Sequence, residues 1–435
     1  MIMENLFRWL DDSTCSFLTV STIKKELEKK NFKKLLIGEP WNLTSGGKYY
    51  VEKNGSAIFA FIPGTKIKEG IGNRIIAAHS DSPCLKLKPN PEIIGEGGVI
   101  SLNVEKYGGG ILYTWFDRPL SMSGRLVLDS GNILKPDIVN FDLKEPVAVI
   151  PHLAIHFNRG VNEGNPISVQ KDMKPVIGFF SKDEIVKSLE RGGMVKCMIA
   201  ERLGIDPKNI LDSEIILYPL EKAQFVGFGK EYYMSGRIDD LSMVFAGLQA
   251  MLDTCDTPCD ATRVLAIFDN EETGSATKQG AASPVLRDIL ERVNNLLGGN
   301  HESLYQSIEN SFMISADDAH AWHPNYSEKY DPSNHPVIGG GPVIKINANG
   351  KYMTDAVGSA IFQKLCMETS VPYQFFVNHS DMAGGSTLGN ISTSQMDMRG
   401  VDVGAPIWAM HSACETAGVK DHEDFVKVFR KFWEF

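Results

Sequence analysis

Two adjacent glutamates, Glu271 and Glu272, come shortly after the apolar run 264–268, which has the composition of a buried strand. Removing two carboxylates from water at such a place is costly unless a nearby group compensates, and a divalent cation would do so. Adjacent side chains on an extended segment point in opposite directions. We therefore expect one glutamate to ligate a metal while the other faces a water molecule as a general base.

Histidine and carboxylate side chains also mark the ends of other predicted elements: His79, Asp81, Asp239, Asp317 and His411. In open α/β sheets, ligands bind at the carboxyl ends of the strands. Imidazoles with several carboxylates and no sulfur ligand suit a pair of zinc, cobalt or manganese ions. The pattern predicts the two-metal site of a hydrolase, in which Asp81 orients the imidazole of His79 from behind. It does not by itself select the peptide bond over another hydrolysable bond.

The elements that must position these groups alternate along the chain. We expect helices at 1–30, 241–252, 283–297 and 355–368, and strands at 48–51, 56–61, 74–78, 263–268, 312–315, 342–346 and 373–377. Ser283 is the expected N-cap of the third helix, with Pro284 as its first residue. This alternation predicts an α/β sheet.

A segment with a different sequence pattern interrupts this alternation of strands and helices. Residues 85–230 contain short β-like runs at 98–104, 124–128 and 147–150, punctuated by glycine and proline, with one helix at 182–202. We therefore expect a catalytic domain made of residues 1–84 and 231–435, with 85–230 inserted as a β-rich domain.

Length, charge and cysteine content narrow the class of protein. A chain of 435 residues is longer than a domain with a single hydrophobic core usually is. Its net charge of −10 argues against nucleic acid or an anionic membrane as a partner. No apolar run is long enough to span a bilayer, and the N-terminus lacks the basic region of a signal peptide. Seven scattered cysteines fit a reducing cytoplasm better than a disulfide framework.

Eight blocks, in order along the chain, carry a resemblance to a known family. They are AAHSDSPCLKLKP (77–89), YGGGILYTWFDRPL (107–120), IPHLAIHFNRGVNEG (150–164), SGRIDDL (235–241), FDNEETGS (268–275), SADDAHAWHPNY (315–326), GPVIKIN (341–347) and AMHS (409–412). Together they resemble the aspartyl aminopeptidase family of dinuclear zinc metallo-aminopeptidases, as a bacterial member. Eight ordered blocks are far more specific than any one motif.

The resemblance implies a fold, an assembly and a set of metal ligands. The fold is a phosphorylase/hydrolase-like, three-layer α/β catalytic domain with an inserted β-rich dimerisation domain, and family members form tetrahedral dodecamers built from dimers. One metal matches His79, Asp239 and Asp317, and the second matches Asp239, Glu272 and His411, with Asp239 bridging. Glu271 matches the general base and Asp81 the acid behind His79. Zinc is the expected metal, with cobalt and manganese as alternatives.

The resemblance also implies substrate contacts. His320, Lys345 and Tyr352 match substrate-binding positions, and His156 matches a histidine lent across the dimer interface to the neighbouring active site. Lys345 could pair with an acidic N-terminal side chain of the substrate. The loop 379–385 departs from the aspartyl-specific pattern, so a neutral residue such as leucine is the other expected preference.

Two other functions compete with an aminopeptidase acting on free N-termini. A metal-dependent deacylase or carboxypeptidase on a similar scaffold would recognise a free carboxylate of its substrate instead of a free amine. Activity on amino-blocked peptides therefore distinguishes it from an aminopeptidase. A non-catalytic scaffold would not need the complete set of expected ligands and base. The glycine-rich segments 108–110 and 339–341 lack the Lys-Ser/Thr of a phosphate-binding loop.

Overall fold

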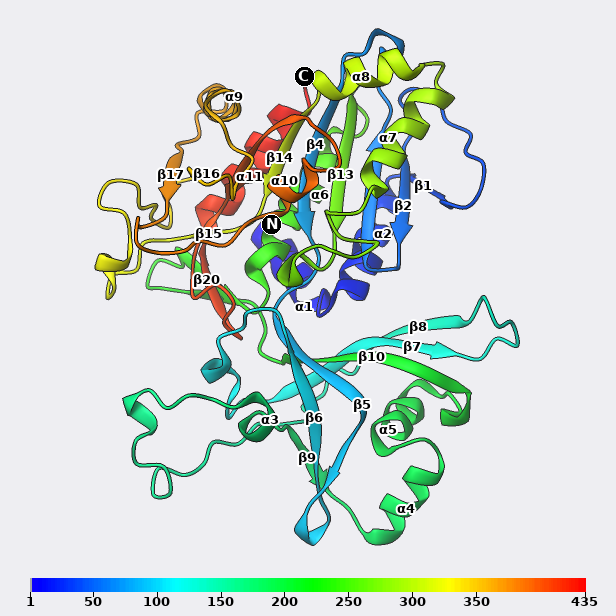
Figure 1. The fold of residues 1–435 in the computed structure, drawn as a ribbon, viewed down its shortest axis with the longest axis vertical. Coiled ribbons are helices and arrows are strands. Elements are labelled where there is room, and N and C mark those ends of the chain that lie inside the picture. The colour runs from blue at the N-terminus through cyan, green and yellow to red at the C-terminus, as the bar shows by residue number, and fades with distance from the viewer. Residues whose placement is uncertain (1) are drawn as a thin grey trace. The chain divides into compact units, whose positions relative to one another are not determined.

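The computed structural model describes residues 2–435, which fold into two compact units (Figure 1). The first comprises the described residues up to Ser82 together with Ala223–Met410 and Glu415–Phe435, and the second comprises Pro83–Lys222 and His411–Cys414. Among residues 2–435, no helix combines the length and the apolar character needed to cross a membrane.

A nine-stranded mixed sheet forms the centre of the first unit. In spatial order its strands are β1 (Lys33–Leu35), β2 (Tyr49–Lys53), β3 (Ala57–Ile62), β13 (Thr262–Phe268), β4 (Asn73–His79), β14 (Phe312–Ala316), β18 (Arg399–Gly404), β16 (Val343–Ile346) and β17 (Gln374–Val377). The central strands β13, β4, β14 and β18 are parallel, whereas β3 and β16 run antiparallel to their neighbours β13 and β18. The carboxyl ends of the four central strands therefore lie on one edge of the sheet.

Helices cover both faces of this sheet. One face packs against α1 (Ile2–Asp12), α2 (Ser16–Lys29), α6 (Ile238–Thr254), α9 (Ala356–Glu368) and α11 (Val419–Phe432), and the other against α7 (Val285–Leu296), α8 (His301–Glu309) and α10 (Leu388–Ser392). Because side chains alternate along a strand, the neighbours Ile75 and Ile76 of β4 enter different cores. The first unit thus has three layers, with the sheet in the middle.

A smaller, five-stranded sheet completes the first unit. Its order is β11 (Gln224–Val226), β12 (Tyr232–Ser235), β20 (Glu415–Gly418), β19 (Pro406–Trp408) and β15 (Ala319–His320). It includes the residues that follow β14 and those that follow β18, so it continues the chain from the edge where the central strands end.

The second unit is built on a six-stranded antiparallel sheet. Its order is β8 (Asp137–Asp142), β7 (Leu120–Leu128), β10 (Ile210–Pro219), β5 (Cys84–Ile94), β6 (Val99–Tyr107) and β9 (Val176–Phe179), with α3 (Val169–Asp172), α4 (Lys182–Glu190) and α5 (Met194–Leu203) alongside. The short segment 411–414 belongs here: the N–H of Ile111 donates to the carbonyl of His411 at 2.9 Å, and Ala413 N–H donates to the hydroxyl of Thr114.

Four details of the predicted elements are wrong. The helix expected at 1–30 is two helices separated at 13–15, although Met1 lies outside the described residues. The helix expected at 182–202 is broken at Gly192 and Gly193, both of which have positive φ. Pro284, not Ser283, occupies the N-cap position of α7, and no side chain caps this helix; the Ser283 hydroxyl donates to the carbonyl of Gly280. Segment 147–150 forms isolated bridges and no strand.

Candidate metal centre

The candidate metal-binding residues of the first unit converge where three neighbouring strands end. His79 is the last residue of β4 and pairs in register with Phe268, the last residue of β13. Asp317 follows β14, the neighbour of β4 on its other side. Glu271 follows β13 after a short turn, and Asp239 lies in the first turn of α6. Parallel pairing therefore brings together residues that are up to 238 positions apart in the sequence.

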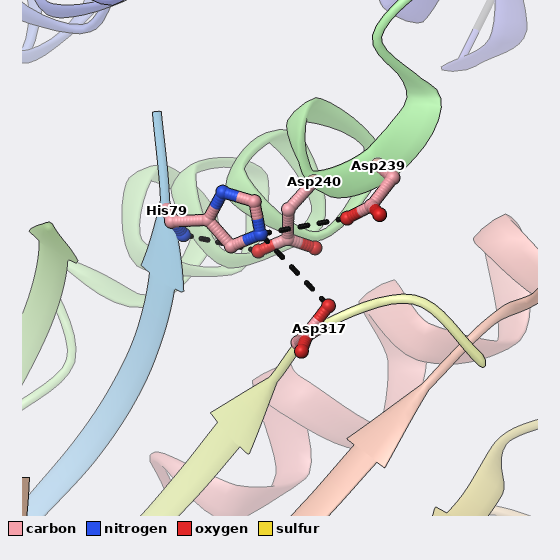
Figure 2. Close-up of side chains that lie close together, drawn as sticks. All are labelled: His79, Asp239, Asp240 and Asp317. Atoms are coloured by element: carbon pink, nitrogen blue, oxygen red, sulfur yellow. Dashed lines mark hydrogen bonds and ion pairs between the residues drawn. The ribbon is translucent and has the colours of Figure 1, made fainter. Parts of the chain in front are cut away.

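The imidazole of His79 faces two carboxylates (Figure 2). Its Nε2 atom lies 3.4 Å from Oδ1 of Asp239 and 3.9 Å from Oδ1 of Asp317. His79 is 1% exposed, Asp239 3% and Asp317 8%. Each residue of this group, together with Asp240, offers a ligand atom within 4.8 Å of the others. Burying carboxylates this close together is costly, and a cation between them would offset that cost.

Asp81 fixes the orientation of the His79 ring. The Nδ1 atom of His79 lies 3.0 Å from the carbonyl oxygen of Asp81, and because a carbonyl can only accept, Nδ1 donates. Nε2 is then the nitrogen that faces the carboxylates of Asp239 and Asp317 and is available to a metal. Asp81 thus contacts His79 through its backbone oxygen, and its carboxylate Oδ1 lies 3.4 Å from Nδ1.

The turn that carries the glutamate pair differs from the prediction. Glu271–Thr273 form a 3₁₀ turn rather than an extended segment, so successive side chains diverge by about 120° instead of 180°. Glu271 and Glu272 both offer a ligand atom within 4.8 Å of His79. The carboxylate of Asp81 holds this turn by accepting the N–H groups of Glu271 and Glu272, each at 3.1 Å.

Sequence reasoning missed Asp240. This residue is fully buried, and its Oδ2 accepts the backbone N–H of His79 at 3.0 Å. Its other oxygen, Oδ1, has no hydrogen-bond partner in the part of the chain that the structure describes. The doublet Asp239-Asp240 was the available signal, since a second acid beside an expected ligand is costly to bury without a role.

A second set of buried groups supports the cluster from behind. Ser242 donates to both oxygens of Asp318, at 3.1 and 2.9 Å. Glu415 accepts the backbone N–H of Asp239 at 3.1 Å. On the opposite side, Nζ of Lys345 lies 3.4 Å from Oδ2 of Asp317. Two of these contacts hold the backbone of Asp239 and the carboxylate of Asp317, and the third holds Asp318, the neighbour of Asp317.

Burial and mutual repulsion shift the protonation equilibria in this cluster. Burial raises the pKa of Glu271 to about 9, and Asp317, Glu272 and Asp81 add to that rise while His79 opposes it. Burial likewise raises the pKa of Asp240 well above its usual range. Burial by itself would lower the pKa of His79, but Asp240, Asp239 and Asp317 outweigh it and raise this pKa well above its usual range.

The donor set fits a divalent metal. It combines one imidazole nitrogen with carboxylate oxygens and contains no sulfur, which suits zinc, cobalt or manganese. The Oδ1 of buried Asp240, which has no hydrogen-bond partner among the described residues, and the carboxylates that face Nε2 of His79 are groups that a divalent cation would neutralise. A bound cation would offset the cost of burying these groups.

The expected substrate contacts of the first unit lie on the Asp317 side of the cluster. Lys345 is on β16 and Tyr352 on the following loop; both are buried, and the Lys345 Nζ lies 5.8 Å from the centre of the Tyr352 ring. His320 is exposed and contacts the ring of Phe376 edge-on, with 5.8 Å between ring centres. Tyr352 and Phe376 share a small apolar cluster with Ala319.

Two expected site residues belong to the second unit. His411 has a positive φ of 68° and its Nδ1 lies 3.3 Å from the carbonyl oxygen of Gly109. His156 is exposed in the loop after β8. The association of His411 with Asp239 and Glu272, and the role of His156 across a dimer interface, stay predictions.

Comparisons with known proteins identify the family. Residues 9–433 match the family model described as aminopeptidase I zinc metalloprotease (M18). The chain is 44% identical over 430 residues to a probable M18 family aminopeptidase 2 from Clostridium novyi (strain NT), covering 99% of this chain and 98% of that protein.

Solved structures give the same result. The fold is similar to a chain in the cryo-EM structure of the Ape4 and Nbr1 complex, with a TM-score of 0.92, 35% identity, and coverage of 100% of this chain and 85% of that one. It is also similar to the mApe1 dodecamer of S. cerevisiae, with a TM-score of 0.86, 27% identity, and coverage of 99% and 96%.

Proposed function

Because the chain belongs to the M18 family of aminopeptidase I zinc metalloproteases and is thus a metallo-aminopeptidase, we propose that it hydrolyses single N-terminal residues from peptides at the cluster around His79. The observation that carries this proposal is the geometry of His79, whose Nε2 faces Asp239 and Asp317 in a buried site at the strand ends. The substrates are peptides with a free α-amino group.

Two divalent metals, zinc in the first instance, are assigned to this site. His79, Asp239 and Asp317 hold the first, and Asp239, Glu272 and His411 hold the second. Bound metals supply Lewis acidity, which polarises the scissile carbonyl and lowers the pKa of water. The donor chemistry described above supports the first set, and the ligand atom that Glu272 offers beside His79 supports its inclusion in the second.

Glu271 is assigned as the general base. Burial raises the pKa of Glu271, and the positive charge of bound metals would lower it again, so that the carboxylate can accept a proton from the attacking water. The same proton is then available to the leaving amine. The carboxylate of Asp81 accepts the Glu271 N–H and thereby holds this residue in place.

The excess of carboxylates also supports a preference for substrates with a free amine. A substrate α-ammonium group is attracted to a cluster of acids, whereas an acylated nitrogen carries no charge. We assign His320, Lys345 and Tyr352 as substrate contacts. In support, Nζ of Lys345 lies 3.4 Å from Oδ2 of Asp317 and 5.8 Å from the centre of the Tyr352 ring. Lys345 favours an acidic N-terminal residue, and the apolar cluster around Phe376 favours a neutral one such as leucine.

We assign the three-layer unit as the phosphorylase/hydrolase-like catalytic domain and the β-rich unit as the dimerisation domain. A dodecamer of dimers, with His156 completing the neighbouring active site, is the proposed assembly. The similarity to the mApe1 dodecamer supports it.

A substrate panel with metal-reconstituted protein tests the proposal. It compares free peptides beginning with Asp, Glu, Leu or Lys with their N-acetylated forms. Cleavage of the free peptides alone is the expected result, and the fastest of the four identifies the preferred residue. Cleavage of the acetylated forms instead would replace the aminopeptidase assignment by a deacylase or carboxypeptidase.

A further inference from the structure

A buried carboxylate that belongs to none of the assigned metal ligands lies under the Asp317 side of the site. Asp402 is on β18 and is fully buried. It pairs in register with Ser315 of β14, two residues before Asp317. Burying a carboxylate without several compensating partners is costly, so the partners of Asp402 indicate what it does.

Two of these partners belong to the loop that carries Tyr352. Oδ2 of Asp402 accepts the N–H of Met353 at 2.6 Å, and the backbone N–H of Asp402 donates to the hydroxyl of Thr354 at 2.8 Å. Tyr352 directly precedes these two residues. The loop between β16 and α9 is therefore fastened to the central sheet at the position next to Tyr352.

A third partner belongs to a different loop. Oδ1 of Asp402 accepts the hydroxyl of Thr387 at 2.5 Å. Thr387 is the residue before α10 and ends the segment that contains 379–385, the loop whose sequence bears on substrate preference. The start of α10 also packs closely against Asp402, because a Cβ atom at Gly389 would lie only 2.8 Å from Oδ1 of Asp402. Only glycine leaves room for this close approach.

Lys345 adds a charge to the same arrangement. The antiparallel register of β16 and β18 pairs Val343 with Gly404 and Ile344 with Val403. Continuing this register places Lys345 opposite Asp402, on the same face of the sheet. Lys345 thus lies 3.4 Å from Asp317, measured at its Nζ, and is the neighbour of Asp402 across the strand pair.

We infer that Asp402 is a positioning residue for substrate selection: it fastens the Tyr352 loop and the segment 379–387 to the sheet and holds the Lys345 charge beside Asp317. It is not one of the assigned metal ligands or substrate contacts and acts through Tyr352 and Lys345. This inference rests on the proposed aminopeptidase function, and it names the element that sets the preference for the N-terminal residue.

The test uses three variants of the full-length, metal-loaded enzyme. Asp402→Asn removes the charge and one of the two acceptor oxygens, and Thr387→Val removes the bond to the second loop alone. Asp421→Asn is the matched control, because Asp421 is equally buried and accepts the N–H groups of Gly339 and Gly341, at 2.6 and 2.8 Å, in a different loop.

We expect Asp402→Asn to raise KM about tenfold, the usual effect of losing one charge-assisted hydrogen bond, with a smaller change in kcat. The ratio of kcat/KM between the preferred and the rejected N-terminal residue should fall by a similar factor. Thr387→Val should show part of this effect, and Asp421→Asn none. If Asp402→Asn keeps the KM and the selectivity of the wild type, the inference is wrong.

Hydrogen exchange provides a readout that does not depend on turnover. Faster exchange in 350–355 and 379–387 is expected for Asp402→Asn, and faster exchange confined to 336–342 for Asp421→Asn. Equal exchange of Asp402→Asn and wild type in both loops would overturn the inference even if activity changed. A wild-type enzyme that is inactive on every free peptide would instead refute the proposed function. The hydrogen-exchange result would then decide whether Asp402 holds the two loops.

Discussion

The carboxylate of Asp81 accepts the backbone N–H of Glu271 at 3.1 Å, while the carbonyl of the same aspartate accepts Nδ1–H of His79. One residue therefore sets both the direction of the imidazole and the position of the turn that carries the assigned general base. This link joins the ends of β4 and β13, which are neighbours in the sheet. Its loss should move both groups at once.

Asp81→Asn tests this link. The asparagine retains one acceptor oxygen, so one of the N–H groups of Glu271 and Glu272 is left buried and unpaired, at a cost of about 1–3 kcal/mol. We expect kcat to fall and zinc affinity to weaken by about 10–100-fold. Steady-state kinetics and zinc competition with a chelator measure the two effects. Unchanged values for both would show that the backbone carbonyl of Asp81 suffices.

Glu271→Gln separates catalysis from metal binding. The glutamine has nearly the same shape but cannot take up a proton at pH 7, so turnover should fall by about 10²–10⁴-fold. Metal content and assembly should stay as in the wild type. Glu272→Gln is the matched control and should lose metal, as expected of a ligand. Normal activity of Glu271→Gln would exclude it as the general base.

His411→Ala tests the assignment of the second metal. Removing this imidazole takes away one of three protein ligands, so the metal content should fall from about two to about one ion per subunit. Elemental analysis after gel filtration measures this content. The first ion, held through His79, should remain. Equal metal content in variant and wild type would count against the ligand role of His411.

His156→Phe tests a site shared between subunits. The side chain is exposed in the second unit, so the fold should survive, while hydrolysis should fall by about 10–100-fold if the imidazole orients substrate in a neighbouring subunit. His152→Gln is the control, because His152 lies in the same loop and is held by Asp117 at 2.6 Å. Full activity of His156→Phe would rule out the shared site.

His422 gives a prediction about stability and pH. It is buried against Phe245, and its ring nitrogens have no hydrogen-bond partner among the described residues. Burial lowers the pKa of His422 to about 4, against about 6.5 for an unfolded chain. Between these values the unfolded chain binds the extra proton, so the stability of the fold decreases as pH falls from 6.5 to 4.

The corresponding measurement is urea unfolding of wild type and His422→Leu at pH 7.5 and 4.5, both with chelator present. The full effect of the pKa difference is about 3 kcal/mol, most of which should be lost by pH 4.5. The free energy of unfolding of the variant should therefore rise relative to that of the wild type as the pH falls. A constant difference between the two proteins at both pH values would contradict the lowered pKa.

Several properties follow from the sequence alone. The alternation of apolar runs and helical segments predicted the α/β class, because burial of one sheet between helices requires that local pattern. The strand-end positions of His79, Glu271 and Asp317 predicted a metal site, because parallel strands end on one edge. Local patterns of this kind depend on neighbouring residues and can be read without a structure.

The tertiary structure decided the rest. Asp240 joins the cluster because its carboxylate accepts the backbone N–H of His79, which is 161 residues away. The proposed role of Asp402 depends on two loops that meet only on the folded sheet. The glutamate pair lies on a 3₁₀ turn because Asp81, 190 residues earlier, accepts its N–H groups. These features arise from long-range packing, whose geometry no local periodicity encodes.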